Sequence, residues 1–142
     1  MKIRRRASVT TSTSTGDRLR IADTSFLYAL FSKTDVFHSR ARGEAMKADP
    51  VVIPAEILSE TLALIHYRRG FASARAAGLW IRSKGLIQIG IPSRRLVARA
   101  WQVFASGRGR LSYPDSVVLA WCAERAAPPL AFDSALLRHA RR

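Results

Sequence analysis

Residues 18–31 read RLRIADTSFLYALF, and in this stretch a short apolar strand pattern changes directly into a helical pattern at Asp23. After Asp23 the large apolar residues recur with the spacing of one helical face, at Phe26, Leu27, Leu30 and Phe31. The stretch therefore predicts a strand followed at once by an amphipathic helix, with a carboxylate at the junction between them.

Three further apolar runs have the length of buried strands: VVIP at 51–54, LIQIGI at 86–91 and PLAF at 129–132. The segments between them are predicted to be helices, including one with the apolar face Leu96, Val97, Ala100, Trp101 and Phe104. Gly70 and Gly107 are predicted to end helices in a left-handed conformation. This alternation of strands and helices predicts an α/β fold with a parallel sheet.

The chain has 142 residues and 48% hydrophobic content, which suits one globular domain. Its longest apolar stretches are too short to cross a bilayer, so no membrane segment is expected. Cys122 is the single cysteine and cannot form an internal disulfide. A reducing cytoplasm is therefore the expected compartment.

A formal net charge of +14 predicts attraction to polyanions, either nucleic acid or acidic lipid. The ten acids are unevenly distributed, because none lies between Glu60 and Asp115 in a stretch that carries ten arginines and lysines. Each carboxylate of this chain is therefore a candidate for a specific role.

Residues 1–17 form a basic, Ser/Thr-rich segment with too few apolar side chains to offset the entropy of ordering. We expect a disordered tail here and a globular domain over residues 18–142. The composition of the tail also resembles a transit peptide, and an upstream start codon or a nonspecific RNA-binding arm would explain it equally well.

Two acids, Asp23 and Asp133, each follow a predicted strand and precede a predicted helix. Ligands of open parallel sheets bind at this carboxyl end of the strands. The alternative role is equally compatible with the sequence, because Asp is a preferred N-cap residue that accepts hydrogen bonds from the first amides of a helix.

Two more acids lie on predicted helices. Glu60 is placed at the edge of an apolar stripe and is expected to face inward, whereas Glu56 lies further round toward solvent. Asp115 heads an apolar face after Pro114, but with Ser112 it also matches a capping box. For Glu60 the alternatives are an exposed side chain or an ion pair with a basic residue.

Together, two acids at strand ends and two on inward helix edges would converge on one rim of the sheet. Carboxylates so close repel one another and raise each other's pKa unless a positive charge lies among them. Oxygen ligands of this kind suit Mg²⁺ or Mn²⁺. The pattern thus predicts a divalent metal held by Asp23, Glu60, Asp115 and Asp133.

Four segments in this order and spacing resemble the PIN domains, in particular the VapC-like toxin ribonucleases of bacterial toxin–antitoxin pairs. They are IADTSFLYALF, IPAEILSETLAL, LSYPDSVVLAWC and LAFDSALL, and the resemblance covers nearly everything from Ile21 onward. It implies a three-layer α/β/α fold around a parallel sheet of about four strands. By this resemblance Asp23, Glu60, Asp115 and Asp133 match the four acidic positions of the family.

The resemblance further implies a Mg²⁺- or Mn²⁺-dependent endoribonuclease with RNA as substrate, a cognate antitoxin protein as partner and a possible homodimer. Ser25 resembles the family's small hydroxyl residue near the first acid, and Glu56 matches no catalytic position. Two departures are the basic tail and the end of the chain at Arg142, where family members run on into a final strand, so the sheet is expected to lack an edge strand.

Arg108 and Arg110, in the flexible sequence SGRGR shortly before Asp115, are the candidate RNA phosphate contacts, although a solvated linker is an equal alternative. Trp80, Trp101 and Trp121 fall on apolar helical faces and are expected in the core rather than as base-stacking platforms.

Three other classes of function are alternatives to a metal-dependent ribonuclease. A non-catalytic nucleic-acid-binding module would explain the charge, and a degenerate PIN scaffold that only dimerises or sequesters a partner is opposed by the presence of all four acids. A haloacid-dehalogenase-like phosphatase needs a second Asp two residues after Asp23, where this chain has Ser25.

Overall fold

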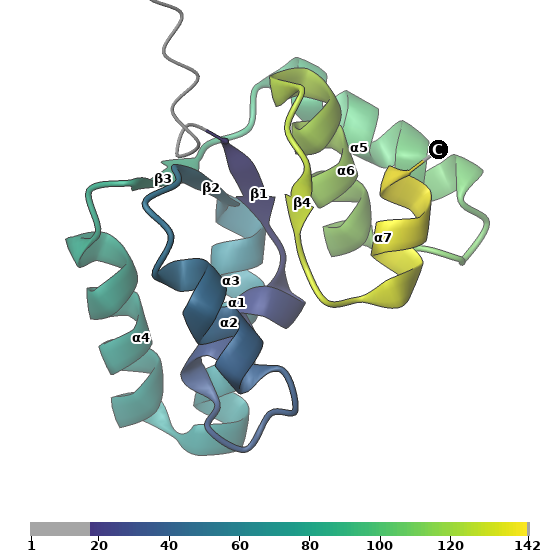
Figure 1. Ribbon diagram of the computed structural model, residues 1–142. Helices are drawn as coiled ribbons and strands as arrows, with labels where there is room; N and C mark the ends of the chain where they lie inside the picture. The colour runs from purple at the N-terminus through teal and green to yellow at the C-terminus, as the bar shows by residue number, and fades with distance from the viewer. Residues whose placement is uncertain (1–17, 142) are drawn as a thin grey trace, which may run out of the picture.

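The computed structural model describes residues 18–141, so the predicted disordered tail at 1–17 lies outside the described residues. Four parallel strands form one sheet, as predicted, and their order in it is β3-β2-β1-β4 (Figure 1). The strands are β1 (Arg20–Ala22), β2 (Val51–Pro54), β3 (Ile87–Gly90) and β4 (Pro129–Leu130). All four predicted strand segments are therefore confirmed.

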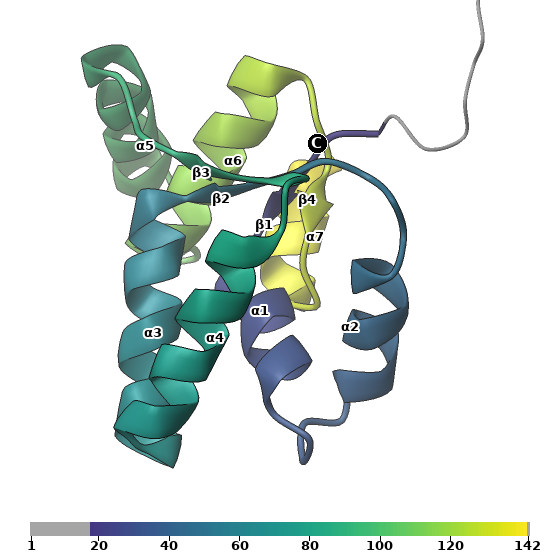
Figure 2. The same cartoon turned by 90° about the vertical axis from the view of Figure 1, so that its left-hand side faces the viewer.

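Seven helices connect and flank these strands in the described residues. They are α1 (Thr24–Phe31), α2 (His38–Ala45), α3 (Ala55–Arg69), α4 (Phe71–Ser83), α5 (Arg94–Ser106), α6 (Tyr113–Arg125) and α7 (Ser134–Ala140). The chain steps from β1 to β2 to β3 in one direction and then returns past β1 to β4. Because parallel crossovers are right-handed, the return places α5 and α6 on the face opposite α1–α4 (Figure 2). The three-layer α/β/α fold is confirmed.

The two central strands supply the middle of the core. Ile21, Val52 and Ile53 are fully or almost fully buried, with helices on both faces of the sheet. Gly90 ends β3 in contact with Trp121, and a Cβ atom there would lie 2.8 Å from the indole ring. Only glycine lets α6 approach the sheet so closely at this point.

Helix ends agree with the predicted positions but only partly with the predicted geometry. Gly70 follows α3 and has φ +89°, a backbone conformation that favours glycine. The prediction for Gly107 is wrong, because it has φ −70° and continues the right-handed turn. The chain instead reverses one residue later, through Arg108 at φ 49° and Gly109 at φ 81°.

The predicted core role of the tryptophans is only partly correct. Trp121 is buried and Trp80 packs against the core, but Trp101 is 59% exposed and its neighbour Val97 is 42% exposed. The reason is that α5 packs mainly against α6 rather than on the sheet. A helix in this outer position buries only a narrow stripe, here Leu96 and Ala100.

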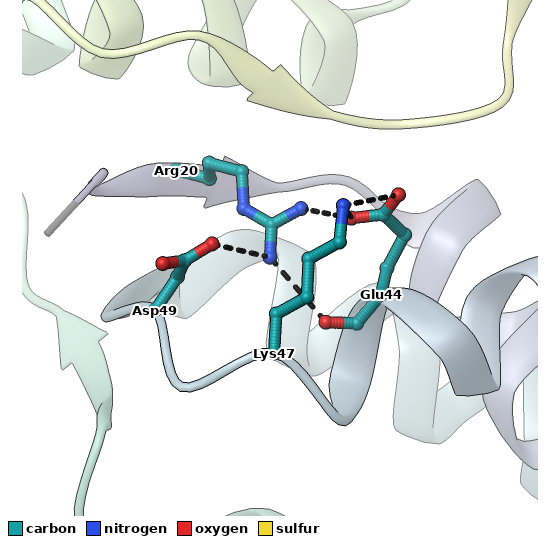
Figure 3. Close-up of polar contacts among 4 residues, drawn as sticks. All are labelled: Arg20, Glu44, Lys47 and Asp49. Atoms are coloured by element: carbon teal, nitrogen blue, oxygen red, sulfur yellow. Dashed lines mark hydrogen bonds and ion pairs between the residues drawn. The ribbon is translucent and has the colours of Figure 1, made fainter. Parts of the chain in front are cut away.

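One group of charged side chains joins the start of β1 to the segment after α2 (Figure 3). The Arg20 guanidinium pairs with Glu44 and lies 3.7 Å from Asp49, while Lys47 pairs with Glu44 at 3.0 Å. Burial raises the pKa of Glu44, but hydrogen bonds from Lys47 and Arg20 outweigh it and leave that pKa below its ordinary value. These two acids are neutralised by local cations.

In residues 18–141 no helix combines the length and the apolar character that crossing a membrane requires.

Candidate active site

Asp23 follows β1 directly and is the N-cap of α1, with only 3% of its surface exposed. Its Oδ2 atom accepts hydrogen bonds from the Ser25 amide at 3.2 Å and the Ser25 hydroxyl at 2.8 Å. The capping role that the sequence allowed is therefore present. It occupies one carboxylate oxygen, so it does not exclude a second role for this side chain.

Ser25 links two of the strand ends. While its hydroxyl donates to Asp23, it accepts a hydrogen bond from the Phe132 amide at 2.9 Å. Phe132 precedes Asp133, so this bond ties the exit of β4 to the start of α1. Ser25 thereby fixes the orientation of the Asp23 carboxylate.

Glu60 is positioned differently from its prediction. Its carboxylate is exposed and accepts a hydrogen bond from the Thr24 hydroxyl at 2.7 Å. Glu56 is the more buried of the two acids, and its Oε2 atom is buried without a hydrogen-bond partner. The buried face of α3 consists of Ile57, Thr61 and Ile65, and Glu60 lies outside this face. Glu60 nevertheless lies beside the residue that follows Asp23.

Asp115 lies in the first turn of α6 and forms the predicted capping box. Its Oδ2 atom accepts from the Ser112 amide at 3.3 Å, and its own amide donates to the Ser112 hydroxyl at 3.2 Å. Helix α6 packs against β1, so this carboxylate lies close enough to Asp23 for their charges to interact.

Asp133 is the N-cap of α7 and accepts a hydrogen bond from the Leu136 amide at 2.8 Å. It lies at the carboxyl end of β4, the strand next to β1. Its carboxylate has no direct contact with the other three acids among the hydrogen bonds of the described residues. Of the four predicted site residues, Asp133 is thus the one that the structure connects least to the others.

The pKa of Asp23 is raised above its ordinary value. Burial is the largest cause, and the negative charge of Asp115 adds to it, whereas the hydrogen bonds from Ser25 lower the pKa only in part. No cation offsets this charge, since every ion pair in residues 18–141 involves Arg20 or Lys47. A positive charge bound beside Asp23 would therefore be favourable.

This donor set fits a hard divalent cation in its chemistry, because Asp23, Glu60 and Asp115 offer carboxylate oxygens beside an uncompensated negative charge. Their side chains do not converge, since across residues 18–141 no three His, Cys, Asp or Glu side chains are arranged to hold a metal ion. Each carboxylate instead keeps a hydrogen bond to its own helix or to Thr24. A shared metal centre of four acids stays a prediction.

One loop and one helix carry three further basic side chains of interest. Arg108 and Arg110 are exposed in the turn before α6, and Arg110 borders a cleft of about 800 Å³ that none of the four acids lines. Arg40 was not predicted from sequence. Its guanidinium lies 5.2 Å from the ring centroid of Phe132, which itself stacks on Phe37 at 4.8 Å. This contact between distant segments had no sequence signal.

Known proteins resemble this chain in family and in fold. The PIN domain family matches residues 20–142. The crystal structure of Mycobacterium tuberculosis VapC20, described as a sarcin-ricin loop cleaving toxin, is similar to this chain with a TM-score of 0.76 and 26% identity. The match covers 85% of this chain and 94% of VapC20.

No curated protein matches the chain by sequence. PIN domains are typically nucleases and generally use divalent metals. With the family match spanning residues 20–142, the four-stranded parallel sheet and the acid at the carboxyl end of β1, the chain belongs to the PIN-domain family.

Proposed function

We propose that this protein is a Mg²⁺- or Mn²⁺-dependent endoribonuclease and the toxin of a toxin–antitoxin pair. The observation that carries the proposal is Asp23, a buried acid at the carboxyl end of β1 whose pKa is raised by burial and by Asp115. A carboxylate kept without a cationic partner in a chain of net charge +14 is energetically unfavourable unless it serves a ligand.

The roles within the site follow from how each side chain is held. Asp23 and Asp115 are the proposed principal metal contacts, with Glu60 joining them when its carboxylate turns from Thr24, and Asp133 contributing from β4. A bound divalent cation supplies an activated water and stabilises charge on the phosphodiester oxygens. Ser25 keeps the Asp23 carboxylate in one orientation, so the site is preorganised on the α1 side.

The proposed substrate is structured RNA, and the likeness to a toxin that cleaves the sarcin-ricin loop supports this choice. Arg108 and Arg110 are exposed just before the helix that carries Asp115, and they are the proposed phosphate contacts on that side. A cognate antitoxin protein and a homodimer complete the proposal, and both rest on likeness to VapC-like toxins.

The test is single-turnover cleavage of a sarcin-ricin stem-loop RNA with Mg²⁺ or Mn²⁺ by wild type and Asp23→Asn. Asparagine caps helices as well as aspartate does, so the variant should stay folded. It loses the charge that holds the metal, and cleavage should fall below detection while RNA binding persists. Chelation of wild type with EDTA should have the same effect.

Glu124→Gln is the matched control, because Glu124 is exposed at the end of α6 that is remote from Asp115 and forms no ion pair within residues 18–141. It should cleave like wild type. Cleavage by Asp23→Asn at the wild-type rate, or cleavage that is indifferent to EDTA, would overturn the metal-nuclease proposal.

A non-catalytic RNA-binding protein on the same fold is the second candidate. The observation that favours it is that Asp23, Glu60, Asp115 and Asp133 all have structural hydrogen-bond partners. RNA binding by wild type without metal-dependent cleavage would select this second candidate.

A further inference from the structure

A second group of polar residues lies where α1 and α3 end, and it contains two arginines and no acid. The guanidinium of Arg68 lies 5.2 Å from the ring centroid of Tyr28. The Nη2 atom of Arg69 donates hydrogen bonds of 2.7 Å to the hydroxyls of Ser32 and Thr34. We call these five residues the Arg68–Arg69 cluster.

Both arginines are held in place without being neutralised. Arg68 and Arg69 are exposed, and neither forms an ion pair in the described part of the chain. The acid nearest in sequence, Asp35, accepts a hydrogen bond from the Phe37 amide. In a folded protein, two neighbouring guanidinium groups without a carboxylate favour binding of an anion.

The contacts leave the donors of both arginines available. Arg68 lies against Tyr28 and directs a hydrogen bond toward its hydroxyl, and a guanidinium has five N–H donors, so others stay available to a ligand. Arg69 uses one of its three nitrogens on the two hydroxyls, so its remaining N–H groups can form the forked contact that a phosphate accepts. The hydrogen bond from Arg68 is the largest cause of the lowered pKa of Tyr28, so the Tyr28 hydroxyl lies beside the same positive charge.

The cluster and the candidate active site both lie along the contact between α1 and α3, called here the α1–α3 junction. At one end of the junction Thr24 of α1 contacts Glu60 of α3, and one turn further along α1 Tyr28 meets Arg68. Arg68 is eight residues after Glu60, which corresponds to about 12 Å along α3. Figures 1 and 2 show both helices running away from the strands' carboxyl ends, so the junction leads outward from the acids.

We propose that the Arg68–Arg69 cluster binds an RNA backbone phosphate a few nucleotides from the cleaved bond. This rests on the proposed ribonuclease function and adds the path by which the RNA leaves the acids, along the α1–α3 junction. An acidic protein segment would bind the same two arginines. The cluster, however, lies on the pair of helices that also carries Thr24 and Glu60 of the candidate active site, and this position favours the nucleic acid.

The experiment measures binding of a fluorescein-labelled sarcin-ricin stem-loop RNA in EDTA, with single-turnover cleavage in Mg²⁺ measured separately. The double variant Arg68→Ala with Arg69→Ala should bind about tenfold more weakly or worse. The slope of log affinity against log salt should fall by about one for each lost phosphate contact. The cleavage rate at saturating protein should stay at the wild-type value, because the cluster is remote from the acids.

The matched control removes the same charge elsewhere, with Arg82→Ala and Arg125→Ala. Both are exposed at the ends of α4 and α6 that lead into β3 and β4, at the amino end of the sheet. Because Arg69 also bonds two hydroxyls, Arg68→Ala alone is included, with thermal midpoints for all variants. A folded Arg68→Ala that binds RNA more weakly than the control supports the proposal even if the double variant is unstable.

The outcomes separate the two proposals. Wild type that cleaves RNA, together with equal RNA affinity for the cluster variants and the Arg82/Arg125 control, would overturn the phosphate site and leave the ribonuclease intact. Wild type that binds but never cleaves would overturn the ribonuclease, while weaker binding by the cluster variants would still support the phosphate site. Absence of any RNA binding by wild type would overturn both.

Discussion

The two ends of β1 use carboxylates in opposite ways. At its amino end Arg20 pairs with Glu44 and Asp49, and the pKa of Glu44 lies below its ordinary value (Figure 3). Just past its carboxyl end Asp23 is almost completely buried with no cation, and its pKa is raised. Arg20 and Asp23, which mark these two environments, are only three positions apart in the sequence.

This contrast separates acids that stabilise the fold from acids that are available to a ligand. A paired carboxylate stabilises the fold as it stands, and a bound cation would add nothing to it. An unpaired buried carboxylate reduces stability until a positive charge arrives, so it is the better candidate for a ligand site. We therefore expect changes at the two ends of β1 to have opposite consequences.

The largest expected effect is on Cys122, a thiol that is largely buried and that also lies within reach of the charge of Asp23. Burial, followed by the charge of Asp23, raises the pKa of Cys122 to about 12. The thiolate is thus scarce at pH 8, and iodoacetamide should label native protein at least about a hundredfold more slowly than urea-unfolded protein.

Asp23→Asn should speed labelling of native protein modestly, whereas Glu44→Gln should not change it. Labelling of native wild type at the rate of the unfolded chain would show that Cys122 is not in the environment described.

The next effect in size is the loss of stability in Arg20→Ala. Removal of the guanidinium leaves Asp49 without its cation and Glu44 with Lys47 alone, and the Arg20 and Asp49 side chains are only 12% exposed. Urea unfolding should show a loss of about 2 kcal/mol, less than for a fully buried pair because Glu44 is partly solvated. Arg82→Ala, at an exposed arginine without an ion pair in residues 18–141, is the control. An equal cost for both variants would contradict the structural role of the Arg20 pairs.

The smallest effect is a pair of opposite pH dependences, measured as thermal midpoints in EDTA. The lowered pKa of Glu44 stabilises the fold above pH 4.5, and this stabilisation is lost as the pH falls further. The raised pKa of Asp23 destabilises the fold at neutral pH, and this penalty disappears as the pH falls toward 3.8.

At pH 7 Glu44→Gln should therefore melt below wild type and Asp23→Asn at or above it, with both differences shrinking in acid. A neutral-pH midpoint for Asp23→Asn well below wild type would mean that the carboxylate is structural and would weaken the metal-site proposal.

The strand and helix pattern was predictable because it depends on local spacing. Each buried strand of a parallel sheet is a short continuous apolar run, so VVIP and PLAF could be recognised without knowing their neighbours. The capping roles of Asp23, Asp115 and Asp133 were also predictable as alternatives, since a cap depends on residues within three positions. The sequence alone thus determined the α/β class and the parallel sheet.

The exposure of these elements and the contacts between their side chains depend on how distant segments pack in the folded chain. Trp101 is exposed because α5 packs on α6, and Glu60 is exposed because the face of α3 that packs inward carries Ile57, Thr61 and Ile65. The Arg68–Tyr28 contact joins residues 40 positions apart, and no local spacing encodes it. Burial and charge pairing depend on the packing of distant segments, so the free carboxylate of Asp23 could be told from the paired one of Glu44 only in the folded chain.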